Sequence, residues 1–106
     1  MSVGDADAVA LLNREMQYHS NAEQIAARFE SISAQAGNAI LVAERDGVVV
    51  GWAHVRIVES LQNEPYAALV GLAVKRESRR QRIGAGLIAA CHAWAVERGH
   101  PDVRLP

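Results

Sequence analysis

The feature that most constrains the fold is a continuous apolar run that leads through a loop into a helical segment. Residues 66–74, YAALVGLAV, suit a central strand that is covered on both faces. Residues 84–98 then carry apolar side chains at helical spacing, and Gly99 is a good helix terminator. The stretch 102–105 has the pattern of one more strand. This order predicts a β-α-β unit with two parallel strands and a right-handed connection.

Two helices are predicted ahead of this unit. Apolar side chains recur at helical spacing over residues 5–18 and again over residues 22–35. Asp5 or Asp7 is the candidate for capping the first helix. In front of the second helix, Asn21 and Gln24 have the spacing of a capping box.

A β-hairpin is predicted between these helices and the central strand. Two β-rich runs, 39–44 and 48–58, flank Asp46-Gly47, and this dipeptide tolerates the positive φ angles of a tight turn. Gly71, inside the third β-rich run, indicates a bulge or a close backbone approach. The second run alternates, with Trp52, His54, Arg56 and Val58 on one face and Ala53, Val55 and Ile57 on the other.

The order α-α-β-β-β-α-β predicts an α+β (mixed α/β) fold, in which helices flank a mostly antiparallel central sheet. At 106 residues, the chain is expected to form one domain over residues 1–106. A net charge of −1 gives no global attraction to nucleic acid or to an acidic membrane. No apolar run approaches the ~20 residues that span a bilayer. The absence of a signal-like N-terminus favours a cytoplasmic location.

The cysteine and histidine content argues against a metal site. Cys91 is the single cysteine, so no internal disulfide can form and a cysteine-based zinc site is not expected. His19, His92 and His100 have no metal-like spacing with one another. We therefore expect no metal ion.

Cations crowd into the loop in front of the last helix. Positions 75–82 hold five of the eleven basic residues, offset only by Glu77. A helix start offers free N–H groups, glycine lets an anion approach the backbone, and arginine binds phosphate oxygens in pairs. Residues 79–86 therefore favour a phosphate or pyrophosphate site, with a merely solvated basic loop as the alternative. Neither a Walker A loop nor a dinucleotide fingerprint is present.

The segment VGLAVKRESRRQRIGAGLIAACHAWAVERGHPDVRL resembles the acetyl-CoA-binding segment of the GCN5-related N-acetyltransferase (GNAT) superfamily. The resemblance is specific over residues 69–105, and the order of the remaining elements is consistent with it. The family pattern, Arg/Gln-x-x-Gly-x-Gly/Ala, fits the letters of Gln81-x-x-Gly84-x-Gly86. Arg79-x-x-Arg82-x-Gly84 fits the helical context better and is preferred, with Arg82 in place of the first glycine.

The resemblance implies that acetyl-CoA is the co-substrate. The backbone N–H groups of residues 80–85 would hold its pyrophosphate, and Lys75, Arg79 or Arg80 would reach the outer phosphates. Residues 72–74 would pair with the pantetheine arm, and the Leu72 N–H would polarise the thioester carbonyl. The expected binding set is Leu72, Ala73, Val74, Arg79, Arg80, Gln81, Arg82, Ile83, Gly84, Ala85 and Gly86.

The proton acceptor is less clearly marked in the sequence. Some family members place a glutamate on the central strand, where this chain has Ala68. We take Glu64 as the candidate base, and Glu59, His54 or a chain of waters as alternatives. The amine attacks the thioester itself, so the reaction needs no nucleophile from the protein.

The chain stops at Pro106, before the segment in which the family often carries the tyrosine that protonates the thiolate. We also expect it to lack the family's first strand, so that the chain is either a fragment or has its sheet completed by a partner subunit. The preferred function is an N-acetyltransferase acting on a primary amine of a small molecule or peptide. The alternative is a non-catalytic, CoA-binding or dimerising domain of the same fold. An unpaired sheet edge favours a homodimer, and without a stacking platform of aromatic residues nucleic-acid binding is not expected.

Overall fold

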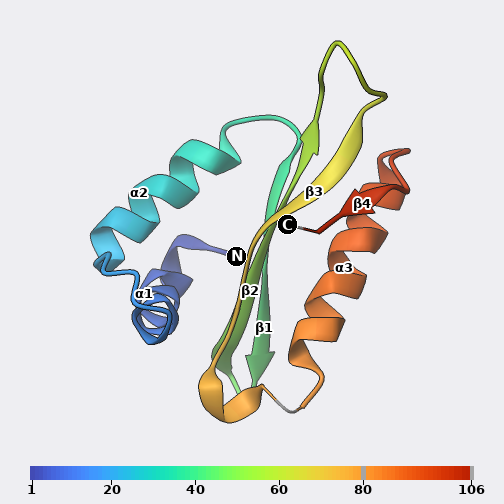
Figure 1. Cartoon of the computed structure of the whole chain (residues 1–106). Helices are drawn as coiled ribbons and strands as arrows, with labels where there is room; N and C mark the ends of the chain where they lie inside the picture. Colours follow the sequence, from blue (N-terminus) through green and yellow to red (C-terminus); the bar gives the residue numbers. More distant parts are fainter. Residues whose placement is uncertain (80, 106) are drawn as a thin grey trace.

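One sheet with helices on both faces makes up the fold (Figure 1). The computed structural model describes residues 1–79 and 81–105. The elements follow the predicted order, and short 3₁₀ turns lie at Val3–Asp5 and Arg76–Ser78. They are α1 (Ala6–Glu15), α2 (Ala22–Ser33), β1 (Asn38–Arg45), β2 (Val48–Val58), β3 (Tyr66–Val74), α3 (Ile83–Glu97) and β4 (Val103–Arg104).

The four strands lie side by side in the order β1-β2-β3-β4. β1 pairs with β2, and β2 with β3, in antiparallel fashion. β3 and β4 are parallel, as predicted for the β-α-β unit. Asp46 and Gly47 turn the first hairpin with φ angles of 52° and 78°, which confirms the predicted turn. The last strand is shorter than expected, since only two residues pair.

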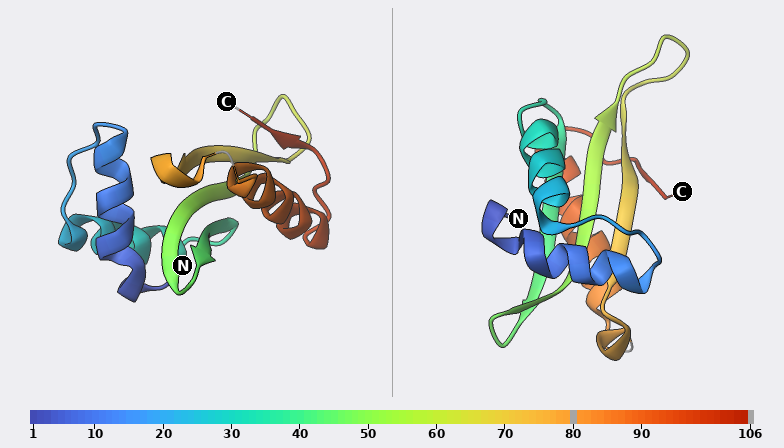
Figure 2. Two further views of the ribbon diagram at one scale, coloured as in Figure 1. Left: turned by 90° about the horizontal axis from the view of Figure 1, so that it is seen from below. Right: turned by 90° about the vertical axis from the view of Figure 1, so that its left-hand side faces the viewer.

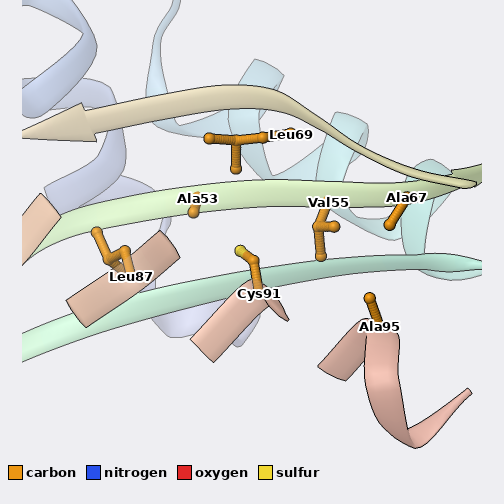
Figure 3. Close-up of a cluster of buried hydrophobic side chains, with 7 residues drawn as sticks. All are labelled: Ala53, Val55, Ala67, Leu69, Leu87, Cys91 and Ala95. Atoms are coloured by element: carbon orange, nitrogen blue, oxygen red, sulfur yellow. The ribbon is translucent and has the colours of Figure 1, made fainter. Parts of the chain in front are cut away.

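Helix α3 covers one face of the sheet, and α1 and α2 cover the other (Figure 2). The α3 face carries the larger buried cluster, which Figure 3 shows. Because neighbouring residues of a strand point to opposite faces, β2 sends Ala53 and Val55 into this cluster and turns Trp52 and His54 toward α1 and α2. This is the predicted alternation of β2.

Two predicted local features have different outcomes. The capping box of α2 is confirmed, since Gln24 N–H donates to Asn21 Oδ1 at 2.8 Å and Asn21 N–H donates to Gln24 Oε1 at 2.9 Å. The prediction that Asp5 caps α1 was wrong: its side chain makes no cap bond there. Instead, its carboxylate accepts the Ser2 N–H at 2.8 Å, because the chain first makes a 3₁₀ turn.

A bulge interrupts the pairing of β2 with β3, as Gly71 indicated. His54 lies opposite Gly71 and Val55 opposite Leu69, so Val70 has no partner on β2. The ring of Trp52 lies over Gly71, and a Cβ added to this glycine would come within 2.7 Å of Trp52 Cζ3. Glycine is therefore needed here for a close approach rather than for an unusual φ.

No helix in the described part of the chain combines the length and apolar character needed to cross a membrane. Across the same residues, no three His, Cys, Asp or Glu side chains gather where they could hold a metal ion.

Candidate functional site

The second half of β3 has an open edge. On the side away from β2, β4 pairs only with Ala67 and Ala68. No strand of the described chain lies beside residues 69–74 on that side (Figure 1). An exposed edge of this kind accepts an extended ligand as an additional strand.

The direction of the backbone groups on this edge follows from the register. The Lys75 N–H donates to the Val50 carbonyl of β2 at 2.7 Å. Alternate residues of an antiparallel strand turn their backbone groups the same way, so Ala73 also faces β2, while Leu72 and Val74 face the open edge. The Leu72 N–H therefore points where the sequence analysis expects a thioester carbonyl.

Arg79 joins the basic loop to this edge. Its Nε donates to the Val74 carbonyl oxygen at 3.1 Å. The Val74 carbonyl therefore already has a partner within the protein, which was not expected for a residue assigned to pantetheine pairing. The remaining N–H groups of the Arg79 guanidinium are held at the end of the open edge.

Arg82 precedes α3 in a left-handed conformation, with φ 59° and ψ 23°. This region of backbone space favours glycine and costs other residues roughly 1 kcal/mol. The family pattern has its first glycine here in the register Arg79-x-x-Arg82-x-Gly84. The backbone therefore favours that register over the alternative that begins at Gln81.

Within residues 1–79 and 81–105, the start of α3 has no side-chain cap, and no acceptor is bonded to the N–H groups of residues 82–85. The Gln81 N–H, one of the expected donors, donates to the Ser78 carbonyl at 3.2 Å, and the Gly86 N–H, just beyond the expected donors, donates to the Arg82 carbonyl at 3.0 Å. These two N–H groups are therefore engaged within the protein, while Gln81 and Gly86 stay predicted members of the binding set. Arg80 lies outside the described residues.

The two glycines at the start of α3 are not required by the fold. A Cβ at Gly84 would meet only Val74 Cγ2, at an ordinary 3.8 Å, and a Cβ at Gly86 would meet nothing within 4 Å. Neither has a positive φ. Glycine inside a helix costs about 1 kcal/mol relative to alanine. Gly84, which lies among the free N–H groups, therefore leaves room for something outside the chain.

Ile83 contributes to this site through its backbone only. Its side chain packs against the α3-face cluster and would lie 3.3 Å from a Cβ on Gly51. This anchor fixes the first turn of α3 against the sheet. Ala85 follows with a small, exposed side chain.

One contact that positions the loop was missed by sequence reasoning. Glu15, at the end of α1, accepts the Arg76 N–H at 2.8 Å through its carboxylate. The two residues are 61 positions apart, and no pattern in the sequence connects them. In the same loop, Lys75 forms a long ion pair with Glu77 at 4.0 Å, which partly engages a cation assigned to phosphate binding.

The structure does not bring Glu64 to the open edge. Glu64 is exposed in the loop that precedes β3, at the end of the strand opposite to the basic loop (Figure 1). Leu72 lies six residues beyond Tyr66, and at ~3.3 Å per residue this separates it from the start of β3 by roughly 20 Å. This placement gives no support to the prediction that Glu64 is the base.

Comparisons with known proteins were made for the whole chain. The model of the acetyltransferase (GNAT) family matches residues 6–105. No curated protein sequence matches significantly.

Several solved structures share the fold. A GNAT family acetyltransferase from Staphylococcus aureus is 14% identical, with a TM-score of 0.87, and the match covers 98% of this chain and 78% of that chain. Glucosamine-6-phosphate N-acetyltransferase from Arabidopsis thaliana is 17% identical, with a TM-score of 0.87 and coverage of 100% and 78%. An aminoglycoside N-acetyltransferase, solved in complex with CoA, is 23% identical, with a TM-score of 0.83 and coverage of 100% and 72%.

Proposed function

The chain belongs to the acetyltransferase (GNAT) family, and from this premise we propose that residues 1–106 form one domain that transfers the acetyl group of acetyl-CoA to a primary amine of a small molecule or peptide. The observation that carries the proposal is the uncapped start of α3 beside the open edge of β3. A helix start attracts anions, and a strand edge binds an extended chain. Acetyl-CoA combines a diphosphate with an extended amide-containing arm.

The binding mode follows from these two features. The N–H groups of residues 82–85 bind the pyrophosphate, and the free N–H groups of Arg79 add positive charge beside it. The pantetheine arm then runs along the open edge of β3. At Val74 only the N–H is available to it, because Arg79 occupies the carbonyl.

The chemistry requires a polarised carbonyl and an amine that can attack it. The Leu72 N–H points out from the strand and donates to the thioester oxygen, on which negative charge develops as the amine nitrogen bonds to the acyl carbon. The C–S bond then breaks and CoA leaves as a thiolate. The protein supplies orientation and hydrogen bonds and forms no covalent intermediate.

Gly84→Ala tests this proposal by separating binding from stability. The added methyl group fits the fold, so the variant gains up to ~1 kcal/mol of unfolding free energy. It nevertheless crowds the pyrophosphate, so calorimetry is expected to show roughly tenfold weaker CoA binding. Ala89→Gly is the matched control on the exposed side of α3, and it loses about 1 kcal/mol while its CoA affinity stays unchanged.

Two results would count against the proposal. If Gly84→Ala binds CoA as tightly as the unmodified protein, the pyrophosphate does not bind at the start of α3. CoA binding by the unmodified protein without thiol release, across a panel of primary amines, would instead identify a non-catalytic CoA-binding or dimerising domain.

The quaternary structure and location are part of the same proposal. We propose a homodimer in the cytoplasm, with acetyl-CoA and an amine as its small-molecule partners and with no nucleic-acid or membrane partner. The outer edges of β1 and β4 are unpaired by any described strand and offer backbone groups to a second copy. Sedimentation equilibrium tests this, and a monomer at all concentrations would refute the dimer.

A further inference from the structure

Helices α1 and α2 cover one face of the sheet (Figure 2). A pocket lies on this face, between the helices and the strands. Its walls are mostly apolar and come from both helices and from β1: Val9, Ile25, Phe29, Ile32 and Ile40. Trp52 and His54 of β2 form its floor. The pocket therefore suits an apolar ligand that presents a polar group to the sheet.

The polar group on this floor is a neutral imidazole. Nε2 of His54 lies 2.9 Å from Oδ1 of Asn38, so Nε2 carries a proton and donates it to this oxygen. Nδ1 is then left with its lone pair. Burial, and to a smaller extent the nearby Arg56 cation, lower the pKa of His54 from its ordinary value, which favours this neutral form.

His54 lines the pocket, and its Nδ1 atom is not fully buried. No hydrogen bond to Nδ1 is found among the described residues. Within this part of the chain, every fully buried side-chain nitrogen or oxygen has a hydrogen-bond partner. Nδ1 lacks one and is therefore not fully buried. His54 thus combines a fixed tautomer with an open acceptor.

The position of His54 connects the pocket to the open edge. His54 lies opposite Gly71 in the bulge, and the next residue is Leu72, whose N–H faces the edge. Partners across an antiparallel pair lie about 5 Å apart. Trp52 is held beside His54 because its Nε1–H donates to Asn13 Oδ1 at 2.9 Å. The pocket floor is therefore next to the place where the proposed function puts the thioester.

We propose that His54 is the proton acceptor of acetyl transfer, that Asn38 is its positioning residue, and that the pocket receives a primary amine with an apolar body. This inference rests on the proposed function. The amine nitrogen forms its bond to the acyl carbon, the C–S bond breaks, and the electron pair leaves with the CoA thiolate. The proton that the nitrogen loses passes to Nδ1 of His54, and later to the thiolate or to solvent, which restores the neutral imidazole.

The charges around the pocket define the class of amine. Among the described residues that line it, Arg28 on α2 is the only one with a charged side chain, and the Met1 amino group is bonded to the Ile40 carbonyl at 3.0 Å. Arg56 is two positions along β2, and α1, β1 and β3 contribute uncharged groups toward His54. No carboxylate lines the pocket within the described residues. A polycation is therefore repelled, and an amine with one positive charge and an apolar body is preferred.

The experiment measures thiol release from acetyl-CoA with phenethylamine and with kanamycin, over about pH 5 to 9, together with CoA binding by calorimetry. Phenethylamine is expected to be the better substrate by roughly tenfold or more in kcat/KM. The kcat for phenethylamine should fall toward acidic pH as His54 becomes protonated.

His54→Gln is expected to lower kcat by roughly 100-fold, to remove this acidic limb and to leave KM for acetyl-CoA unchanged. Asn38→Ala should lower kcat by about tenfold and shift the limb, which a purely structural role would not do. His92→Gln, an exposed histidine on α3, is the matched control and should behave as the unmodified protein.

The outcomes are separable. If His54→Gln keeps both kcat and the acidic limb, the assignment of His54 is wrong while the proposed function stands. Preference for kanamycin would refute the assigned amine class. If the unmodified protein neither binds CoA nor releases thiol, the proposed function itself fails. If His54→Gln does not fold, the nitrogen-15 chemical shifts of His54 in the unmodified protein give the test. A protonated Nδ1 in the folded protein at neutral pH would overturn the proposal.

Discussion

The two faces of the sheet are packed in opposite ways. On the α3 face, small and apolar side chains of β2 and β3 contact Leu87, Cys91 and Ala95 with almost no exposed surface. On the other face, α1 packs through a smaller cluster, and between α2 and the sheet an open pocket remains. That face also holds two partly buried polar contacts, Trp52 with Asn13 and His54 with Asn38.

The difference shows how one strand can serve two purposes. Ala53 and Val55 are fully buried on the α3 face, while Trp52 and His54, their neighbours in sequence, reach the pocket. The methyl-rich face supplies most of the burial that stabilises the domain. Because the α3 face supplies this stability, the opposite face can contain a cavity and lone pairs without a hydrogen-bond partner. A close-packed core excludes both.

The largest expected effect is the difference in lost unfolding free energy between a leucine truncated on one face and an isoleucine truncated on the other. Leu87→Ala leaves a cavity in the close-packed α3 face and should cost about 3 kcal/mol of unfolding free energy. Ile32→Ala widens a pocket that is already open and should cost about 1 kcal/mol. Urea unfolding of both variants measures this. Equal losses would mean that the two faces are packed alike.

A smaller effect is expected when a side chain fills the space between the β3 backbone at Gly71 and the Trp52 ring. In Gly71→Ala the new Cβ conflicts with the Trp52 ring at 2.7 Å, so the ring must move away from Asn13. We expect a loss of about 2 kcal/mol and a change in tryptophan fluorescence. Gly86→Ala is the steric control, because its Cβ meets nothing, and it should not lower stability. An unchanged fluorescence spectrum in Gly71→Ala would contradict this account of the pocket floor.

The smallest expected effect is on the pH dependence of stability. The folded-state pKa of His54 is lowered from 6.5, so between that lowered value and 6.5 the unfolded state binds more protons. The contribution of His54 is therefore present above about pH 6.5 and is lost as the pH falls. Thermal unfolding at neutral and acidic pH should show a smaller acid loss in His54→Gln than in the unmodified protein or in His92→Gln. An identical loss in all three would show that His54 is not desolvated.

Much of the fold was predictable because its signals are local. Asp46-Gly47 marks its turn through the φ angles it tolerates, and Asn21 with Gln24 marks a helix start through bonds three residues apart. The alternation of β2 correctly separated the two faces. The candidate loop was also visible, because glycine and arginine in front of an apolar helix form an anion site from adjacent residues.

Other parts of the site depend on pairs that are distant in sequence. Glu15 supports the basic loop through Arg76, and Asn38 sets the tautomer of His54 from the neighbouring strand. Arg79 looked like a free cation, yet its Nε is bonded to β3. Glu64 looked close to the central strand, yet it lies at the wrong end.

The amino-acid sequence by itself determined the order of the elements, the hairpin turn, the alternation of β2 between two faces and the gathering of arginine and glycine in the loop before α3. These depend on backbone preferences and on side-chain periodicity, which act over a few residues. Only the tertiary structure decided which N–H groups remain free, which edge of β3 is open, and which imidazole nitrogen faces a pocket. Those properties arise from the packing of distant segments, because a hydrogen-bonding group becomes a site only where the rest of the chain leaves it unpartnered.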